Sequence, residues 1–89
     1  MPEITLTIRH QVGLHARPAA LFVQTAKRFT SEIEVRHGER RANAKSILGV
    51  LALGANQGAV LTVSAEGGDA GEALAALEAL VEANFGEGS

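Results

Sequence analysis

Four segments of this chain show the patterns of β-strands. This feature limits the folds available to the chain more than any other. Residues 4–8, 32–36 and 60–65 alternate apolar and polar side chains with a period of two, as strands that bury one face do. A shorter segment, residues 40–44, follows the second across a turn at Gly38. If this segment lies at the edge of a sheet, its two arginines would protect it from pairing with another chain. The pattern predicts a four-stranded sheet.

Helical patterns occupy the intervals between these strands. Residues 16–29 contain apolar side chains at helical spacing, and one face of that helix is expected to be buried. That face consists of Ala19, Phe22, Val23 and Ala26. Ser46 is suited to cap a short helix that reaches Leu53. A last helix is expected to begin near Asp69, which with Glu72 three residues later resembles a capping box. Its apolar stripe is Leu74, Leu77 and Val81.

The resulting element order is β-α-β-β-α-β-α in a chain of 89 residues. A chain of this length forms one domain, so residues 1–89 are expected to be a single α+β domain with a frayed tail at 86–89. The two longer helices can cover one face of the sheet and leave its other, polar face in water. Periodicity alone leaves the strand order open, and a ferredoxin-like arrangement would use the first six elements.

Composition excludes several kinds of function. The chain has no cysteine, so disulfide, zinc-thiolate and thiol redox chemistry are ruled out. A net charge of −2 gives no reason to expect a nucleic acid partner. No segment looks like a signal peptide or a membrane span, so a cytoplasmic protein without membrane insertion is expected. His10, His15 and His37 fall on different loops, so neither a metal site nor a cofactor is expected.

The segment Gly13-Leu14-His15-Ala16-Arg17-Pro18 places a histidine just before a helix. Pro18 is tolerated in the first helical turn. The amides at a helix N-terminus attract anions, and Arg17 adds a guanidinium that suits phosphate oxygens. A neutral imidazole beside such an anion site can accept a phosphoryl group on its own nitrogen. A motif this short also occurs in ordinary surface loops, so taken alone it leaves both interpretations open.

The chain from Ile4 to about Val81 resembles the HPr family, the histidine-containing phosphocarrier proteins of the bacterial phosphoenolpyruvate-dependent sugar phosphotransferase system. Four blocks carry the resemblance, namely residues 13–20, 29–33, 44–50 and 57–67. One block alone would be weak, but four in this order and at these spacings are specific. The resemblance implies an open-faced β-sandwich, in which an antiparallel sheet of order 1-4-2-3 carries three helices on one face.

The resemblance also implies a function. His15 would accept a phosphoryl group from phosphorylated enzyme I and pass it to histidines of sugar-specific IIA components. Such a protein is a carrier with a phosphohistidine intermediate, not an independent turnover enzyme. The phosphate would lie on Nδ1, cradled by the amides of Ala16 and Arg17, and Arg17 would stabilise its charge. The alternative is a regulatory HPr-like protein, either a nitrogen-branch carrier or a corepressor partner phosphorylated at Ser46.

The short helix is expected to present a docking surface for these partners. A helix this short is not expected to bury all of its large apolar side chains. Val50 and part of Ile47 should face the core, and Leu48 and Leu51 should stay exposed. The docking surface comprises Ala20, Gln24, Lys27, Lys45, Ile47, Leu48 and Leu51. Its lysines would steer acidic partners to a monomeric carrier.

Ser46 has two interpretations. It is either a structural helix cap or a site of regulatory phosphorylation, whose charge would lie beside the docking surface. The second interpretation would add HPr kinase/phosphorylase and a transcriptional regulator to the partners.

Overall fold

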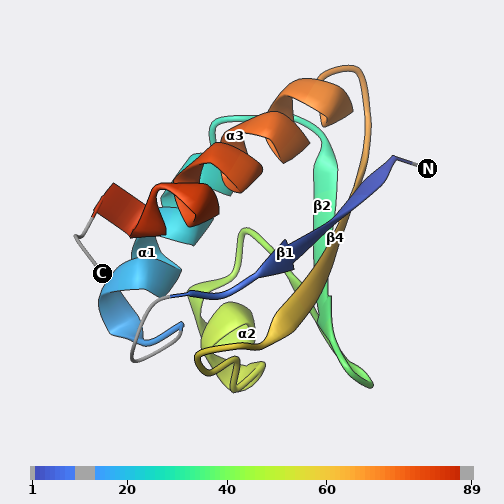
Figure 1. Ribbon diagram of the computed structural model, residues 1–89. Helices are drawn as coiled ribbons and strands as arrows, with labels where there is room; N and C mark the ends of the chain where they lie inside the picture. The colour runs from blue at the N-terminus through green and yellow to red at the C-terminus, as the bar shows by residue number, and fades with distance from the viewer. Residues whose placement is uncertain (1, 10–13, 87–89) are drawn as a thin grey trace.

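The computed structural model describes residues 2–9 and 14–86, and within them the elements follow the predicted order (Figure 1). The strands are β1 (Glu3–Thr7), β2 (Glu32–His37), β3 (Arg40–Asn43) and β4 (Val60–Glu66). The helices are α1 (Ala16–Ala26), α2 (Ile47–Ala52) and α3 (Ala70–Glu82), and α3 is followed by a 3-10 turn, η1 (Asn84–Gly86). The predicted frayed tail begins at Gly86, and residues 87–89 lie outside the described part of the chain.

The strands form one antiparallel sheet in the order β1-β4-β2-β3. The last strand in the sequence, β4, therefore lies between β1 and β2. In the register of these pairs, Ser64 of β4 faces Glu3 of β1 on one side and Glu34 of β2 on the other. This arrangement confirms the strand order that the family resemblance implied, and the ferredoxin-like alternative is wrong.

All three helices lie on one side of the sheet, and the hydrophobic core lies between the two layers (Figure 1). The strands contribute alternate residues to it, because successive side chains of a strand point to opposite faces. The predicted faces of α1 and α3 are confirmed as buried. The core includes Leu6, Ile33, Val35, Leu61 and Val63 from the sheet, Phe22 and Val23 from α1, and Leu74, Leu77 and Val81 from α3. Among the described residues, no helix is long and apolar enough to cross a membrane.

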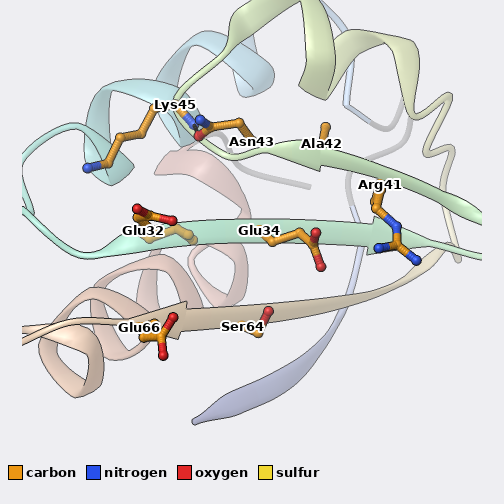
Figure 2. A pocket seen from close by; sticks show the side chains of 9 residues that line it. Glu32, Glu34, Arg41, Ala42, Asn43, Lys45, Ser64 and Glu66 are labelled. Atoms are coloured by element: carbon orange, nitrogen blue, oxygen red, sulfur yellow. Dashed lines mark hydrogen bonds between the residues drawn. The ribbon is translucent and has the colours of Figure 1, made fainter. Parts of the chain in front are cut away.

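The other face of the sheet is open and charged (Figure 2). It contains a hollow of about 710 Å³ with three carboxylates in its lining, those of Glu32, Glu34 and Glu66. Glu32 and Glu66 stand directly opposite each other on β2 and β4. Arg36 lies on the same face and pairs with Glu3 at 3.0 Å. This face therefore meets water, as the alternation of the strands predicted.

Helix α1 is shorter than predicted, because it ends at Ala26 and not at residue 29. The next three amides remain hydrogen-bonded, but the ladder tightens. Lys27 donates to the carbonyl of Val23 four residues back, whereas Arg28 and Phe29 donate only three residues back. Such tightened turns are usual where a helix ends. No glycine or proline marks this end in the sequence, so the prediction ran too far.

Asp69 corrects a second prediction, because its side chain does not cap its own helix. Its carboxylate instead accepts hydrogen bonds from the backbone amides of Thr30 and Ser31, both at 2.9 Å, and from both hydroxyl groups. These bonds lower the pKa of Asp69 from 3.8 to about 2, and the Ser31 hydroxyl makes the largest contribution. The start of α3 is thereby tied to the start of β2.

Candidate functional site

His15 occupies the position that the motif predicted, immediately before the first residue of α1. Its backbone is extended, with φ −90° and ψ −167°, and its carbonyl accepts the first helical hydrogen bond, from Ala19, at 2.9 Å. Ala16 and Arg17 follow in the exposed first turn, and Pro18 is buried. The amides of Ala16 and Arg17 are the first two of α1, and the first amides of a helix point out of its N-terminal end. The imidazole therefore stands at the positive end of the helix dipole.

The His15 side chain is half-exposed, and its Nδ1 atom is covered by the surrounding protein. The residue before it fixes its place in the fold. Leu14 is buried, and its amide donates to the carbonyl of Ala55 at 2.8 Å. Residues 10–13, including the predicted loop glycine Gly13 and His10, lie outside the described part of the chain. Among the described residues, His15 is therefore anchored through the segment that follows α2.

Ser46 caps α2, as predicted. Its hydroxyl oxygen accepts a hydrogen bond from the amide of Gly49 at 3.1 Å. Gly49 suits this position because a Cβ there would lie only 3.1 Å from the Cβ of Ala42. The cap function of Ser46 is thus confirmed, and its phosphorylation stays a prediction.

The exposure of the apolar residues of α2 also follows the prediction. Val50 is fully buried, whereas Leu48 is 78% exposed, Ile47 39% and Leu51 36%. A leucine this exposed buries little apolar surface and adds little to the stability of the fold. Its apolar side chain is therefore available for contact with a partner. The structure confirms the exposure, and the docking role of these residues stays a prediction.

A groove of about 530 Å³ separates α1 from α2. Six of the seven residues predicted to form the docking surface line it, and only Leu51 does not. The six are Ala20, Gln24, Lys27, Lys45, Ile47 and Leu48. On the α1 side the lining runs from Ala20 to Lys27, so the groove begins five residues after His15 and extends toward the other end of the helix.

The lysines of the docking surface differ in what their ammonium groups do. Lys27 is exposed at the end of α1. Lys45 instead donates from Nζ to the carbonyl of Phe29 at 2.7 Å, and so ties the start of α2 to the segment after α1. Lys45 keeps its positive charge in this contact, because the carbonyl is neutral, and the steering of partners by both lysines stays a prediction. Nothing in the local sequence pairs residues 29 and 45.

Two residues contact the C-terminal end of α2, and these contacts were not predicted from the sequence. Nδ1 of His37 lies 3.0 Å from the carbonyl oxygen of Leu53, and Nη1 of Arg40 donates to the carbonyl of Ala52 at 3.0 Å. His37 was expected on a loop, yet it is the last residue of β2, half-buried and hydrogen-bonded. The signal that could have revealed both is the short helix, whose last carbonyls need donors from elsewhere. No three His, Asp or Glu residues of ranges 2–9 and 14–86 are placed to hold a metal ion.

Together these residues form a surface site and not an enclosed pocket. An imidazole at a helix N-terminus can act as a nucleophile toward an anionic group, and the helix favours the anionic product. The groove between α1 and α2, lined by apolar and polar side chains, is suited to another protein surface and too open to enclose a small substrate. The arrangement fits a group that is exchanged between proteins.

Comparison with known proteins gives the same picture. The family described as "PTS HPr component phosphorylation site" matches residues 2–83. The chain is 46% identical to the HPr-like protein Crh of Halalkalibacterium halodurans, over 92% of this chain and 98% of that protein. It is 42% identical to the phosphocarrier protein HPr of Neisseria meningitidis, over 99% of each. A crystal structure of HPr from Thermoanaerobacter tengcongensis superposes with a TM-score of 0.97 at 53% identity, covering all of both chains.

Proposed function

The chain belongs to the HPr family of phosphocarrier proteins, and from this membership we propose that His15 carries a phosphoryl group from phosphorylated enzyme I to IIA components of sugar uptake. The observation that supports this most is the position of His15, half-exposed at the N-terminus of α1, the helix that forms one wall of the groove. A carrier needs an accessible nucleophile next to a docking surface. It does not need a pocket that encloses a substrate.

The proposed transfer exchanges one nitrogen–phosphorus bond for another. A neutral imidazole nitrogen of His15 attacks the phosphorus with its lone pair, and the histidine of the donor leaves with the electron pair of the broken bond. Donor and product are both phosphohistidines, so the step is close to thermoneutral. The amides of Ala16 and Arg17 offer hydrogen bonds to the phosphate oxygens, and the Arg17 guanidinium balances charge in the transition state.

The family resemblance assigns the phosphate to Nδ1, which the protein covers in this conformation. Attack through Nδ1 therefore requires the imidazole to rotate until this nitrogen meets the partner. His15 is half-exposed, so part of its side chain already reaches solvent.

The partners are proposed to dock on the groove and on the exposed residues of α2. Leu48 supplies the apolar anchor, since it is large and 78% exposed. Lys27 supplies a charge that attracts an acidic partner, and such charges act mainly on the rate of association. The docked partner would then meet His15 at the end of the same helix.

The test is phosphorylation by phosphoenolpyruvate and purified enzyme I. Mass spectrometry should detect one added phosphate per chain, labile in acid, although the sequence contains three histidines. His15→Ala should keep the circular dichroism spectrum of the wild type and gain no phosphate. His10→Ala is the matched control and should gain one. Acid-labile phosphate on His15→Ala, or none on the wild type, would contradict the proposal.

A regulatory function is the second candidate, and the position of Ser46 favours it. Ser46 lines the same groove, so a phosphate on its hydroxyl would place about two negative charges on the proposed docking surface. The similarity to an HPr-like protein named Crh is consistent with such a role. Incubation with ATP and a purified HPr kinase/phosphorylase should then give an acid-stable phosphate on the wild type and none on Ser46→Ala. No acid-stable phosphate on the wild type would reject this candidate.

A further inference from the structure

The segment that ends α2 and follows it, residues 52–55, accepts hydrogen bonds from two distant parts of the chain. From the β2–β3 hairpin, Arg40 donates to the carbonyl of Ala52, and Nδ1 of His37 lies 3.0 Å from the carbonyl oxygen of Leu53. A carbonyl oxygen only accepts, so Nδ1 of His37 carries the hydrogen in this contact. From the other side, the amide of Leu14 donates to the carbonyl of Ala55 at 2.8 Å. Residues 52–55 thus connect the hairpin to the residue before His15.

Helix α2 depends on such contacts more than the longer helices do. It has six residues, and Val50 is the only one of them that is buried. A helix well below about 12–15 residues is not stable by itself. In its last turn, the carbonyls of Val50 and Leu51 accept from the amides of Leu53 and Gly54, and the carbonyl of Ala52 accepts from the Arg40 side chain. A cationic donor at this end is also attracted by the negative end of the helix dipole. Besides the buried side chain of Val50, contacts at both ends therefore hold α2 in place, with Ser46 at one end and the hairpin at the other.

We propose that His37 and Arg40 are positioning residues for phosphoryl transfer. They hold residues 52–55, and through them they fix the docking residues of α2 relative to Leu14, the residue before His15. This inference rests on the proposed function. In transfer between two bound proteins, the reacting nitrogen must be positioned accurately relative to the phosphorus while the partner occupies the groove. A misplacement of about an ångström can cost about 10²-fold in rate. A looser end of α2 would weaken docking and misplace His15 relative to the docked partner.

The kinetic test compares the double variant His37→Phe/Arg40→Gln with the wild type as acceptor from phosphorylated enzyme I. Arg41→Gln is the matched control, because Arg41 is the next residue of β3, has the same charge and makes no hydrogen bond to α2 among the described residues. The double variant should lose about tenfold in kcat/KM, the equivalent of one or two hydrogen bonds, with both a raised KM and a lowered kcat. Arg41→Gln should stay within about twofold.

Salt separates positioning from direct contact with a partner. A positioning effect should persist when the ionic strength is raised, since the lost contacts lie within the protein. A loss that disappears at high salt would mean that Arg40 attracts the partner by its charge, and it would overturn the proposal. Equal kcat/KM for the double variant and the wild type would also overturn it.

Amide hydrogen exchange tests the connection independently of enzyme I. The exchange rate of the Leu14 amide should rise in the double variant and stay unchanged in Arg41→Gln, because the acceptor of this amide lies in the segment that the hairpin holds. Unchanged exchange at Leu14 would overturn the proposed connection. A wild type that enzyme I does not phosphorylate would refute the proposed function, while the exchange measurement would still decide whether the hairpin holds Leu14 in place.

Discussion

A methyl group added at Gly67 is expected to destabilise the fold more than one added at any other glycine of the described chain. Gly67 has φ +148°, which side chains other than hydrogen rarely allow. A Cβ at this position would lie 2.8 Å from the Cα of Ser31 and 2.9 Å from its Cβ. Carbon atoms in contact prefer 3.5–4.0 Å, roughly an ångström more. Because the Cα belongs to the backbone that leads into β2, no side-chain rotation relieves the overlap.

The expected cost has two parts. The backbone conformation costs a non-glycine residue about 1–3 kcal/mol. Overpacking against atoms that cannot move away costs about 1–3 kcal/mol more. Gly67→Ala should therefore lower the free energy of unfolding by about 4 kcal/mol, the middle of the summed range. A domain of this size loses about 4–8 °C of Tm per kcal/mol, so its Tm should fall by roughly 15–30 °C.

Two other glycines separate these contributions in urea titrations and thermal melts followed by circular dichroism. Gly58 has φ +89° but no atom within 4 Å of the added Cβ, so Gly58→Ala should show the backbone cost alone. Gly68 has neither a left-handed φ nor a neighbour within 4 Å, so Gly68→Ala should stay within about 0.5 kcal/mol of the wild type. If Gly67→Ala proves no less stable than Gly58→Ala, the close approach to Ser31 does not exist.

Four further changes test the proposed site and the Asp69 contacts. Arg17→Ala should slow transfer by up to about 10²–10³-fold, nearer the lower figure because Arg17 is exposed, and stopped-flow rates equal to the wild type would exclude a catalytic role. Leu48→Glu should raise the Kd for enzyme I while Tm stays nearly constant, and the reverse result would place Leu48 in the core. Ser46→Asp should weaken binding of enzyme I at low salt and less so at high salt, without melting α2, because aspartate also caps helices. Equal affinities at low salt would leave Ser46 as a cap alone. Asp69 contributes stability that is complete above its ordinary pKa of 3.8 and is lost as pH falls through about 2, so Asp69→Asn should flatten the stability profile between these values. Parallel profiles for the two proteins would show that the carboxylate contacts do not stabilise the fold.

Local patterns predicted the elements and their buried faces because those features depend on neighbours two to four residues apart. The face of α1 around Phe22 and the exposure of Leu48 are both of this kind. The strand order does not depend on near neighbours. The β1–β4 pair joins Glu3 to Ser64, and a local periodicity carries no information about residues so far apart in the sequence. For the order, the family resemblance supplied what the residue pattern lacked. His15 was likewise found by its motif, and its anchoring through Ala55 was not.

The errors share one physical origin. Asp69 was assigned to its own helix, and no partner within the fold was assigned to Lys45, because sequence rules consider the nearest candidates for a polar side chain. Their actual partners are Ser31 with Thr30, and Phe29, all in the segment that leads from α1 into β2. His37 repeats the error on the hairpin. A buried or half-buried polar group takes whichever partner the tertiary fold provides, and only the packed structure specifies which one that is.

The central place of β4 determines when the sheet can form during synthesis. Among the described strands, β1 pairs with β4 alone, whereas β2 and β3 can already close as a hairpin across Gly38. At about 5–20 residues per second, a ribosome needs several seconds to proceed from β1 to β4. Throughout that interval the backbone of β1 has no strand to pair with. The four-stranded sheet can therefore close only after β4 is made, and a nascent chain that stops before Val60 has no strand to join β1 to the β2–β3 hairpin.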